Sequence, residues 1–272
     1  MGYSMNNDIN ITSIPKVKCA NCNQRIHCFM KKASEEEING LPADFIEIST
    51  LEKGEYLYKK GAKFSYIYQL RIGAIKNEIV FENGLRQVIQ FLLPGNLLGL
   101  DGISSKKYQV DAISQTNSQF CKIKIEEVKK IPAQYSNLTK VIENEMGTLL
   151  NLSNLHVINL VNLNAIERLA DFLINYANRL GAIGFDRESF ILPMNRDDLA
   201  NYLGIKTETI SRLLTQLEEI GAIQIRNRQV EIISRRPIFQ LIETAFIREK
   251  NLLQNNAASI YPKSLEKRML KI

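Results

Sequence analysis

Residues 198–214 read DLANYLGIKTETISRLL, and this stretch decides the fold of the C-terminal third of the chain. Asn195 can cap a short helix, RDDLANYL, because its side-chain oxygen can accept a hydrogen bond from the first turn. That helix ends at Gly204, which permits the tight turn in LGIK. Thr207 can cap a second helix, ETISRLLTQLEEIG, with Glu208 where the helix dipole favours an acid. Two short helices joined in this way predict a helix-turn-helix.

The second of these helices has an apolar side and a polar edge. The apolar positions form its inner side; they are Ile210, Leu213, Leu214 and Leu217. Glu208, Ser211 and Arg212 lie along the opposite edge of the first turns, where a recognition helix meets base edges. Arg212 can bind guanine O6 and N7 together, Glu208 can accept from a cytosine amino group, and Ser211 can contact either base of a pair.

A winged hairpin follows, in which AIQI and VEII flank residues 226–228 and the tip can touch phosphates. The competing interpretation is an ordinary helical pair with solvated charges that never binds DNA. Residues 165–245 hold ten bases and eleven acids, so this region offers no broad basic surface for non-specific binding. Its preference for DNA therefore depends on the resemblance described below.

Two other patterns precede this region. From Leu51 to Lys124 short apolar runs alternate with glycines, and the pair Asn83-Gly84 is a hairpin signal. These runs predict a compact antiparallel roll. From Asn137 to Asn164 a leucine, isoleucine or valine recurs every three or four residues, which predicts one long helix.

The long helix carries the spacing of a two-helix seam. The seam positions follow one another at steps of four, three, four and three; they are Met146, Leu150, Ser153, Val157 and Leu160. Apolar residues off the seam would pack against the chain's own domains. We expect this helix to pair with a second copy in a homodimer; the alternative is a helix buried within one chain.

Composition and charge limit the classes of protein to which the chain can belong. The chain has 272 residues, 45% hydrophobic content and a formal net charge of +6, which suits an anionic partner. The basic excess lies at the two ends, in residues 16–32 and 246–272. No signal-peptide core begins the chain, and its amide-rich apolar run, Met146–Ile166, is too polar for lipid. We therefore expect a soluble, cytoplasmic protein without a membrane partner.

The sequence contains few residue patterns suited to acid–base catalysis or to phosphate binding. The chain has no phosphate-cradling glycine motif and two histidines, His27 and His156, of which the second lies on the long helix and is expected to serve in packing. This predicts that the protein is not an enzyme.

Four cysteines give the strongest chemical signal. Cys19, Cys22 and Cys28 have the spacing Cys-x2-Cys-x5-Cys, and Cys121 lies on a candidate strand. In a reducing compartment such a group indicates metal or redox chemistry rather than disulfides. Four thiolates are the ligand count of an iron–sulfur cluster or of a zinc site. A free core cysteine at position 121 stays open, and His27 is expected to be a solvated neighbour because four thiols complete a set.

TETISRLL following DLANYLG closely resembles the DNA-binding helices of the Crp/Fnr family of bacterial transcription regulators, and ETISR is most similar to its FNR branch. The resemblance implies an α+β fold: an N-terminal cyclic-nucleotide-binding-like β-roll, a long dimerisation helix and a C-terminal winged helix-turn-helix. It divides the chain into a cysteine-rich cluster-binding segment (1–35), a β-roll sensor domain (36–135), a dimerisation helix (136–164), a DNA-binding domain (165–245) and a basic tail (246–272). The tail is either a helix or an arm that adds non-specific affinity for DNA.

The resemblance also implies a cofactor and partners. In oxygen-sensing FNR proteins, four cysteines so placed hold a [4Fe–4S] cluster; the implied ligands here are Cys19, Cys22, Cys28 and Cys121, with zinc as the alternative metal. A homodimer would bind inverted repeats of the TTGAT kind and act with RNA polymerase, as activator, repressor or both, under oxygen control. The implied DNA-binding residues are Thr207, Glu208, Thr209, Ser211 and Arg212. Thr207 stands where FNR proteins often have valine, which affects preference at an outer base pair.

Two departures from family patterns carry expectations of their own. The segment PGNLLGLDGISSKKYQVDA lacks the glutamate and arginine with which other members bind a cyclic nucleotide, and Asp101 and Lys107 would substitute poorly, so no cyclic nucleotide is expected. FNR proteins can carry an acid on the dimer seam, where like charges oppose pairing. Ser153 occupies the centre of the seam here, so we expect a dimer that depends less on its cluster.

Overall fold

The structure is a computed structural model, and it describes residues 13–14, 22, 28, 45–129 and 136–254. The predictions for Cys19, His27, most of segment 1–35 and the tail beyond Gln254 lie outside the described residues.

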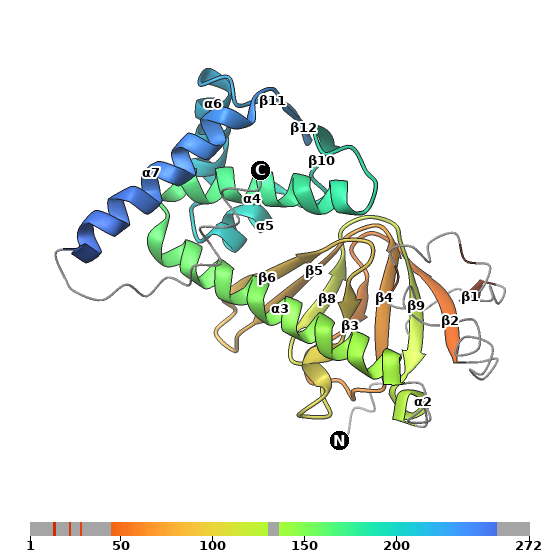
Figure 1. Cartoon of the computed structure of the whole chain (residues 1–272). Helices are drawn as coiled ribbons and strands as arrows, with labels where there is room; N and C mark the ends of the chain where they lie inside the picture. Colours follow the sequence, from red (N-terminus) through yellow and green to blue (C-terminus); the bar gives the residue numbers. More distant parts are fainter. Residues whose placement is uncertain (1–12, 15–21, 23–27, 29–44, 130–135, 255–272) are drawn as a thin grey trace.

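The N-terminal half is an antiparallel β-roll of two sheets (Figure 1). In the described residues one sheet has the strand order β1-β2-β9-β4-β7, and the other has the order β3-β8-β5-β6. Their bounds are β1 (Ser13–Ile14), β2 (Ile46–Leu51), β3 (Tyr56–Tyr58), β4 (Tyr66–Ile72), β5 (Ile75–Val80), β6 (Arg86–Leu92), β7 (Leu97–Leu98), β8 (Asp111–Ser114) and β9 (Ser118–Lys124), with the 3-10 helix η4 at Leu100–Gly102. The hairpin predicted at Asn83-Gly84 is confirmed, because it joins β5 to β6.

Aromatic and aliphatic side chains fill the space between the two sheets. Tyr58 stacks on Tyr108 with ring centroids 4.0 Å apart, and Phe120 of β9 is fully buried beside them. Leu97 and Leu98 belong to the same core. The segment PGNLLGLDGISSKKYQVDA therefore supplies core residues to the β-roll.

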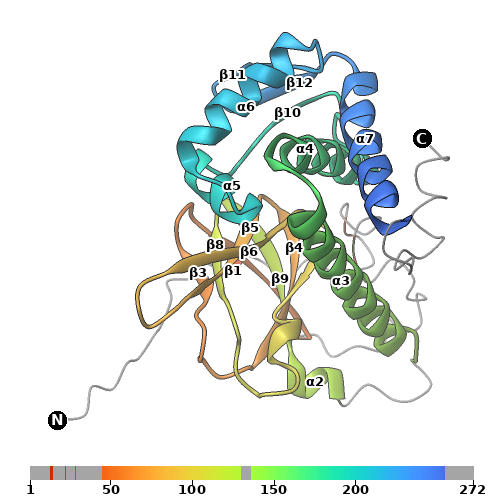
Figure 2. The ribbon, with the colours of Figure 1, turned by 90° about the vertical axis from the view of Figure 1, so that its left-hand side faces the viewer.

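Two helices follow the roll: the short α2 (Ile125–Lys129) and the long α3 (Ser136–Asn162). The long helix predicted from the apolar spacing is confirmed. Figures 1 and 2 show α3 lying along one side of the β-roll. Val141, Ile142 and Leu149 on that side are half-buried against the roll core. No helix in the described part of the chain combines the length and apolar character that a membrane span requires.

The winged domain comprises α4 to α7. Its elements are α4 (Ala165–Ala182), β10 (Ser189–Ile191), α5 (Arg196–Leu203), α6 (Thr207–Glu219), β11 (Ile223–Arg226), β12 (Gln229–Ile232) and α7 (Arg235–Gln254). The prediction of a winged helix-turn-helix is confirmed by α5, α6 and the three-stranded sheet β10-β12-β11. Helix α7 continues past residue 245, so residues 246–254 of the predicted tail are helical.

The predicted N-terminal cap is confirmed for α5 and is wrong for α6. Asn195 caps α5 by accepting from the Asp198 backbone N–H at 2.7 Å, and Gly204 ends it with φ of 64°. The predicted cap of α6 by Thr207 is wrong, because Lys206 occupies the cap position and its side chain makes no capping bond. The Thr207 hydroxyl instead donates to Asp197 at 2.5 Å, which ties the start of α6 to α5.

A buried ion cluster joins the β-roll to the winged domain. Lys76 of β5 lies 2.8 Å from both Glu78 and Asp198, and Arg86 of β6 also contacts these two carboxylates. Lys76, Glu78 and Asp198 retain 6%, 4% and 2% of their accessible surface. Beside them, Asn201 of α5 donates to the Arg86 carbonyl at 2.7 Å. Two positive and two negative side chains thus compensate one another inside the contact.

The apolar core also crosses this contact. Val88, Phe91 and Leu93 of the roll belong to the hydrophobic cluster of the winged domain, and the Phe91 ring lies 5.2 Å from that of Tyr202. The Arg179 guanidinium of α4 donates to the Phe91 carbonyl at 2.8 Å. The hairpin β5–β6 therefore belongs structurally to both domains.

We expect Lys76→Met to destabilise the protein, because it leaves two buried carboxylates with one cation. Loss of one member of a buried ion pair costs about 3 kcal/mol, and urea unfolding measures it. Lys124→Met, at an exposed position of β9, is the matched control. Equal unfolding midpoints for the two variants would show that the cluster does not hold the domains together.

Candidate functional site

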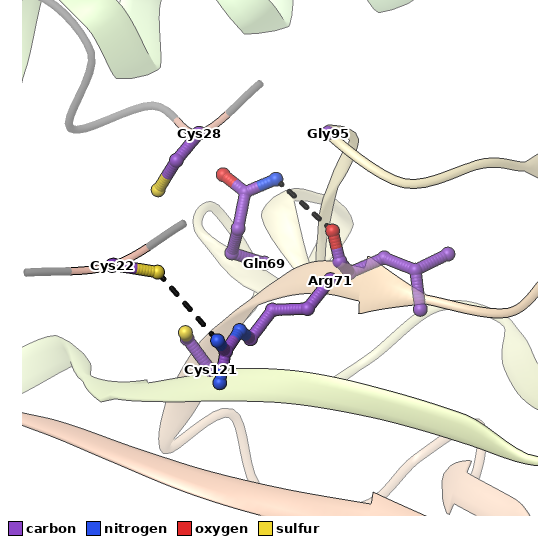
Figure 3. A pocket seen from close by; sticks show the side chains of 7 residues that line it. Cys22, Cys28, Gln69, Arg71, Gly95 and Cys121 are labelled. Carbon is purple, nitrogen blue, oxygen red and sulfur yellow. Dashed lines mark hydrogen bonds between the residues drawn. The ribbon is translucent and has the colours of Figure 1, made fainter. Parts of the chain in front are cut away.

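Three of the four predicted metal ligands share one pocket (Figure 3). Cys22 and Cys28 come from the N-terminal segment, and Cys121 comes from β9, 93 positions beyond Cys28. Figure 3 shows the three thiols pointing toward the same space. The other lining residues are Gln69, Leu70, Arg71 and Gly95.

Cys121 has a rigid position within the sheet. Strand β9 lies between β2 and β4, so Cys121 faces Ile48 on one side and Gln69 on the other. Its side chain is buried, with 8% of its surface exposed. A ligand on a central strand has its backbone hydrogen-bonded on both sides, so it gives the pocket one fixed corner.

Two polar side chains of β4 reach into the pocket. The Arg71 guanidinium donates from Nη2 to the Cys22 sulfur at 3.6 Å, while its buried Nε has no hydrogen-bond partner in the described part of the chain. Gln69 is almost fully buried and donates to the carbonyls of Leu70 and Asn96, at 3.5 and 3.3 Å.

The pocket's thiols are the donor type that both zinc and an iron–sulfur cluster use. Among the described residues, no three histidine, cysteine or acidic side chains stand close enough together to hold a single ion. Zinc draws each thiolate to about 2.3 Å from one centre, whereas a four-iron cluster takes each thiolate on a different iron. The described thiols line one pocket, and the choice between zinc and a cluster stays a prediction.

Asn96 connects the pocket to two helices. Its backbone carbonyl accepts from Gln69 and from the Leu70 N–H, at 3.3 and 3.0 Å. Its side-chain oxygen accepts from Arg179 of α4 at 3.2 Å, and its amide hydrogen-bonds the carboxylate of Glu145 on α3. Burial raises the pKa of Glu145 above its usual value, and hydrogen bonds from the Leu97 backbone and the Asn96 side chain, together with the charge of Arg179, offset part of that rise.

Asn96 and Arg179 carry no signal in the sequence that marks them as neighbours of the pocket. Pro94 and Gly95 mark a turn, but no spacing indicated that the next side chain would contact two distant helices.

The exposed edge of α6 carries the predicted base-reading residues. Ile210, Leu213, Leu214 and Leu217 are buried, so the predicted inner side is confirmed. Glu208, Ser211 and Arg212 are exposed, and Thr207 and Thr209 are half-buried. Their contact with bases stays a prediction.

The wing is built as the sequence predicted, with one addition. Asn227 at its tip has φ of 57°, and its carbonyl accepts from Arg196 of α5 at 2.8 Å. Arg228 donates to the Pro193 carbonyl at 3.2 Å. Of the two arginines at the predicted tip, Arg226 and Arg228, the second is therefore partly engaged within the domain.

An apolar stripe on α3 faces solvent. Met146, Leu150 and Val157 of the predicted seam expose 41%, 62% and 59% of their surface, and Ser153 is exposed between them. Leu160 is half-buried near Gly204. Val161, which the predicted seam omitted, is 78% exposed. We define the α3 stripe by its exposed members: Met146, Leu150, Ser153, Val157 and Val161.

His156 links α3 to α5 by packing, as predicted. Its ring stacks on Tyr202 with centroids 4.1 Å apart, and burial lowers the pKa of the imidazole.

Two protein-family models match the chain. A cyclic nucleotide-binding domain model matches residues 48–135, and a Crp-like helix-turn-helix domain model matches residues 167–237. Together with the geometry of α5, α6 and the wing, they define a class: DNA-binding transcription regulators with a β-roll and a Crp-like helix-turn-helix.

Similar proteins narrow the class. The chain is 30% identical over 241 residues to "Electron transport regulator A" of Shewanella oneidensis, covering 89% of this chain and 92% of that protein. It is 29% identical over 225 residues to "Transcriptional activator protein anr" of Pseudomonas aeruginosa, covering 83% and 92%. The structure of FixK2 from Bradyrhizobium japonicum matches with a TM-score of 0.66 at 27% identity, over 71% of this chain and 96% of that one.

The chain belongs to the Crp/Fnr family, and it is a transcription regulator of the FNR/Anr type. The prediction that it is not an enzyme agrees with these relatives, which are named as regulators. The α+β prediction with a cyclic-nucleotide-binding-like roll is confirmed.

We expect Arg212→Ala to weaken binding to a duplex carrying a TTGAT-type inverted repeat by about 2 kcal/mol, roughly 30-fold, because a two-point guanine contact would be lost. Fluorescence anisotropy on specific and scrambled duplexes measures it. Lys63→Ala, an exposed roll lysine, removes the same charge far from α6. If Arg212→Ala weakened both duplexes equally, Arg212 would be a phosphate contact instead of a base reader.

Proposed function

We propose that this chain is a cytoplasmic, oxygen-responsive regulator of the FNR type. In this proposal Cys19, Cys22, Cys28 and Cys121 hold a [4Fe–4S] cluster that controls dimerisation and binding to TTGAT-like inverted repeats, together with RNA polymerase. The observation that carries it is the pocket in which Cys22, Cys28 and Cys121 meet with Arg71. The cited relatives, named as a transcriptional activator and an electron transport regulator, support the regulatory part.

A bound cluster would be a metal site that oxygen can break down, and its cysteine ligands would connect distant segments of the chain. Cys22 and Cys28 belong to a segment that must be ordered to reach Cys121. Ligand binding that orders a segment contributes its free energy to that ordered state. The N-terminal segment is thereby tied to the central strand of the β-roll only while the metal site is intact.

Asn96 connects the cysteine pocket to α3, the proposed dimerisation helix. Gln69 lines the cysteine pocket and hydrogen-bonds the Asn96 carbonyl, while the Asn96 side chain contacts Glu145 of α3 and Arg179 of α4. A displacement of β4 at the pocket would move the same peptide that positions both helices. Both sites then bias one element, which is the physical requirement for coupling.

The α3 stripe supports a homodimer. Four large apolar side chains on one exposed edge lose contact with water when a second copy covers them, and burial contributes about 25 cal/mol per Å². Pairing along α3 would relate two copies of α6 by a two-fold axis, as an inverted repeat requires.

A cyclic nucleotide is not part of the proposal. Leu97, Leu98 and Tyr108 pack in the roll core, and burial raises the pKa of Asp101. These residues lie in the segment that would hold a nucleotide's ribose and phosphate in other family members, and they are used here for packing.

Anaerobic reconstitution with iron and sulfide tests the proposed cofactor. We expect the wild-type chain to become brown with four irons per monomer, and Cys121→Ala to lose the cluster because one corner is missing. Gln119→Ala, on the same strand but outside the pocket, is the control. A colourless wild-type protein that retains zinc would support a zinc-stabilised regulator, and a normal cluster in Cys121→Ala would exclude Cys121 as a ligand.

We expect Ser153→Asp to weaken the dimer by about 2 kcal/mol, roughly 30-fold in its dissociation constant, because two carboxylates would face each other across the stripe. Asn151→Asp adds the same charge at an exposed position off the stripe and should have little effect. Sedimentation velocity of cluster-bound and metal-free samples measures both. Wild-type protein without metal should keep some dimer at micromolar concentration; a purely monomeric sample would contradict the role assigned to Ser153.

A further inference from the structure

We propose that Arg71 is a positioning residue for the iron–sulfur site, where it holds the Cys22 thiolate and slows loss of the cluster in air. This inference rests on the proposed function. It names a residue that neither the cysteine spacing nor the resemblance to FNR proteins singled out.

The position of Arg71 follows from the pleat of β4. Leu70 points into the roll core and is 1% exposed, so its neighbour Arg71 emerges on the other face of the sheet, where Cys22 lies. Its Nη2 donates to the Cys22 sulfur at 3.6 Å. Of the described residues that line the pocket, Arg71 is the only one with a positively charged side chain.

The guanidinium also has one donor that the described residues leave unpaired. Its Nε is buried and has no hydrogen-bond partner among them. A buried donor left unpaired costs free energy, so natural structures rarely keep one without a reason. A sulfur-rich anion in the adjacent pocket would give this N–H an acceptor.

The charge of the proposed cluster indicates whether Arg71 slows or accelerates loss of the cluster. A [4Fe–4S]2+ core with four thiolates carries a net charge of about −2. The positively charged guanidinium of Arg71 stabilises that negative charge. Transfer of one electron from a bound cluster to dioxygen, giving superoxide, would make the site less negative, and the stabilisation by Arg71 would then be smaller. Arg71 therefore disfavours oxidation and favours retention of iron.

The test compares Arg71→Gln, Arg71→Lys and Lys124→Gln after anaerobic reconstitution of the full-length chain. Lys124 is an exposed lysine of β9 outside the pocket, so its variant removes the same charge from the same domain. Two readouts are used: the half-life of the visible absorbance in air-saturated buffer, and iron retained against a chelator without oxygen. Changes to groups around a metal typically alter affinity 10- to 100-fold. We expect about a tenfold loss in both readouts for Arg71→Gln and no change for Lys124→Gln.

Arg71→Lys separates the two contributions. A wild-type half-life would assign the effect to charge, and a half-life like that of Arg71→Gln would assign it to the guanidinium hydrogen bond; either result supports the proposal. Thermal unfolding of each metal-free variant shows whether it folds. If Arg71→Gln does not fold, Arg71→Met, which also removes the charge while keeping an unbranched side chain, takes its place, and a wild-type half-life and iron retention for that variant would overturn the proposal.

The result that overturns it directly is a folded Arg71→Gln variant with the half-life and iron retention of the wild type. A wild-type chain that takes up no cluster at all would instead remove the proposed function and this inference with it.

Discussion

Asp198 occupies the contact on which the arrangement of the molecule depends. It brings the first helix of the helix-turn-helix onto Lys76 and Arg86 of the β-roll, in a contact from which water is almost excluded. Burying charges is costly unless each has a partner, so this cluster tolerates few other geometries. Phe91 and Tyr202 pack beside this ion cluster. The winged domain therefore contacts the β-roll directly, in addition to being joined to it through α3. The orientation of α6 is therefore set jointly by the long helix and by the hairpin β5–β6.

In the proposed function, this shared contact is the route by which a change at the cysteine pocket reaches the winged domain. The cysteine pocket, Asn96 and the start of the contact at Phe91 lie on or next to strands of one β-roll. Arg179 of α4 donates to both Asn96 and the Phe91 carbonyl, so one guanidinium connects the pocket's turn with the winged domain. Interfaces packed in this way change between discrete arrangements instead of deforming gradually. In the proposed function, the intact cysteine site stabilises the arrangement in which α3 pairs.

Features that depend on residues close together in the sequence were predictable more often than contacts between residues far apart in the sequence. The spacing of Ile210 and Leu213 identified the inner side of α6, and Asn83-Gly84 identified a hairpin, because both signals act within a few residues. The cap of α6 was wrong because the Thr207 hydroxyl is used by Asp197, ten residues earlier. The partner of Asp198 was not predictable, since nothing in β5 marks Lys76 as buried. Cysteine count indicated the candidate site, but Arg71 became visible only once β4 was placed beside the thiols.

The central claim is that the cysteine pocket controls pairing along α3. Sedimentation velocity on a single anaerobically reconstituted sample, measured before and after admission of air and with iron determined in each state, tests it most directly. The account predicts a coloured dimer before air, and afterwards a colourless protein that associates more weakly yet retains some dimer. An unchanged dissociation constant after complete loss of iron would contradict the account.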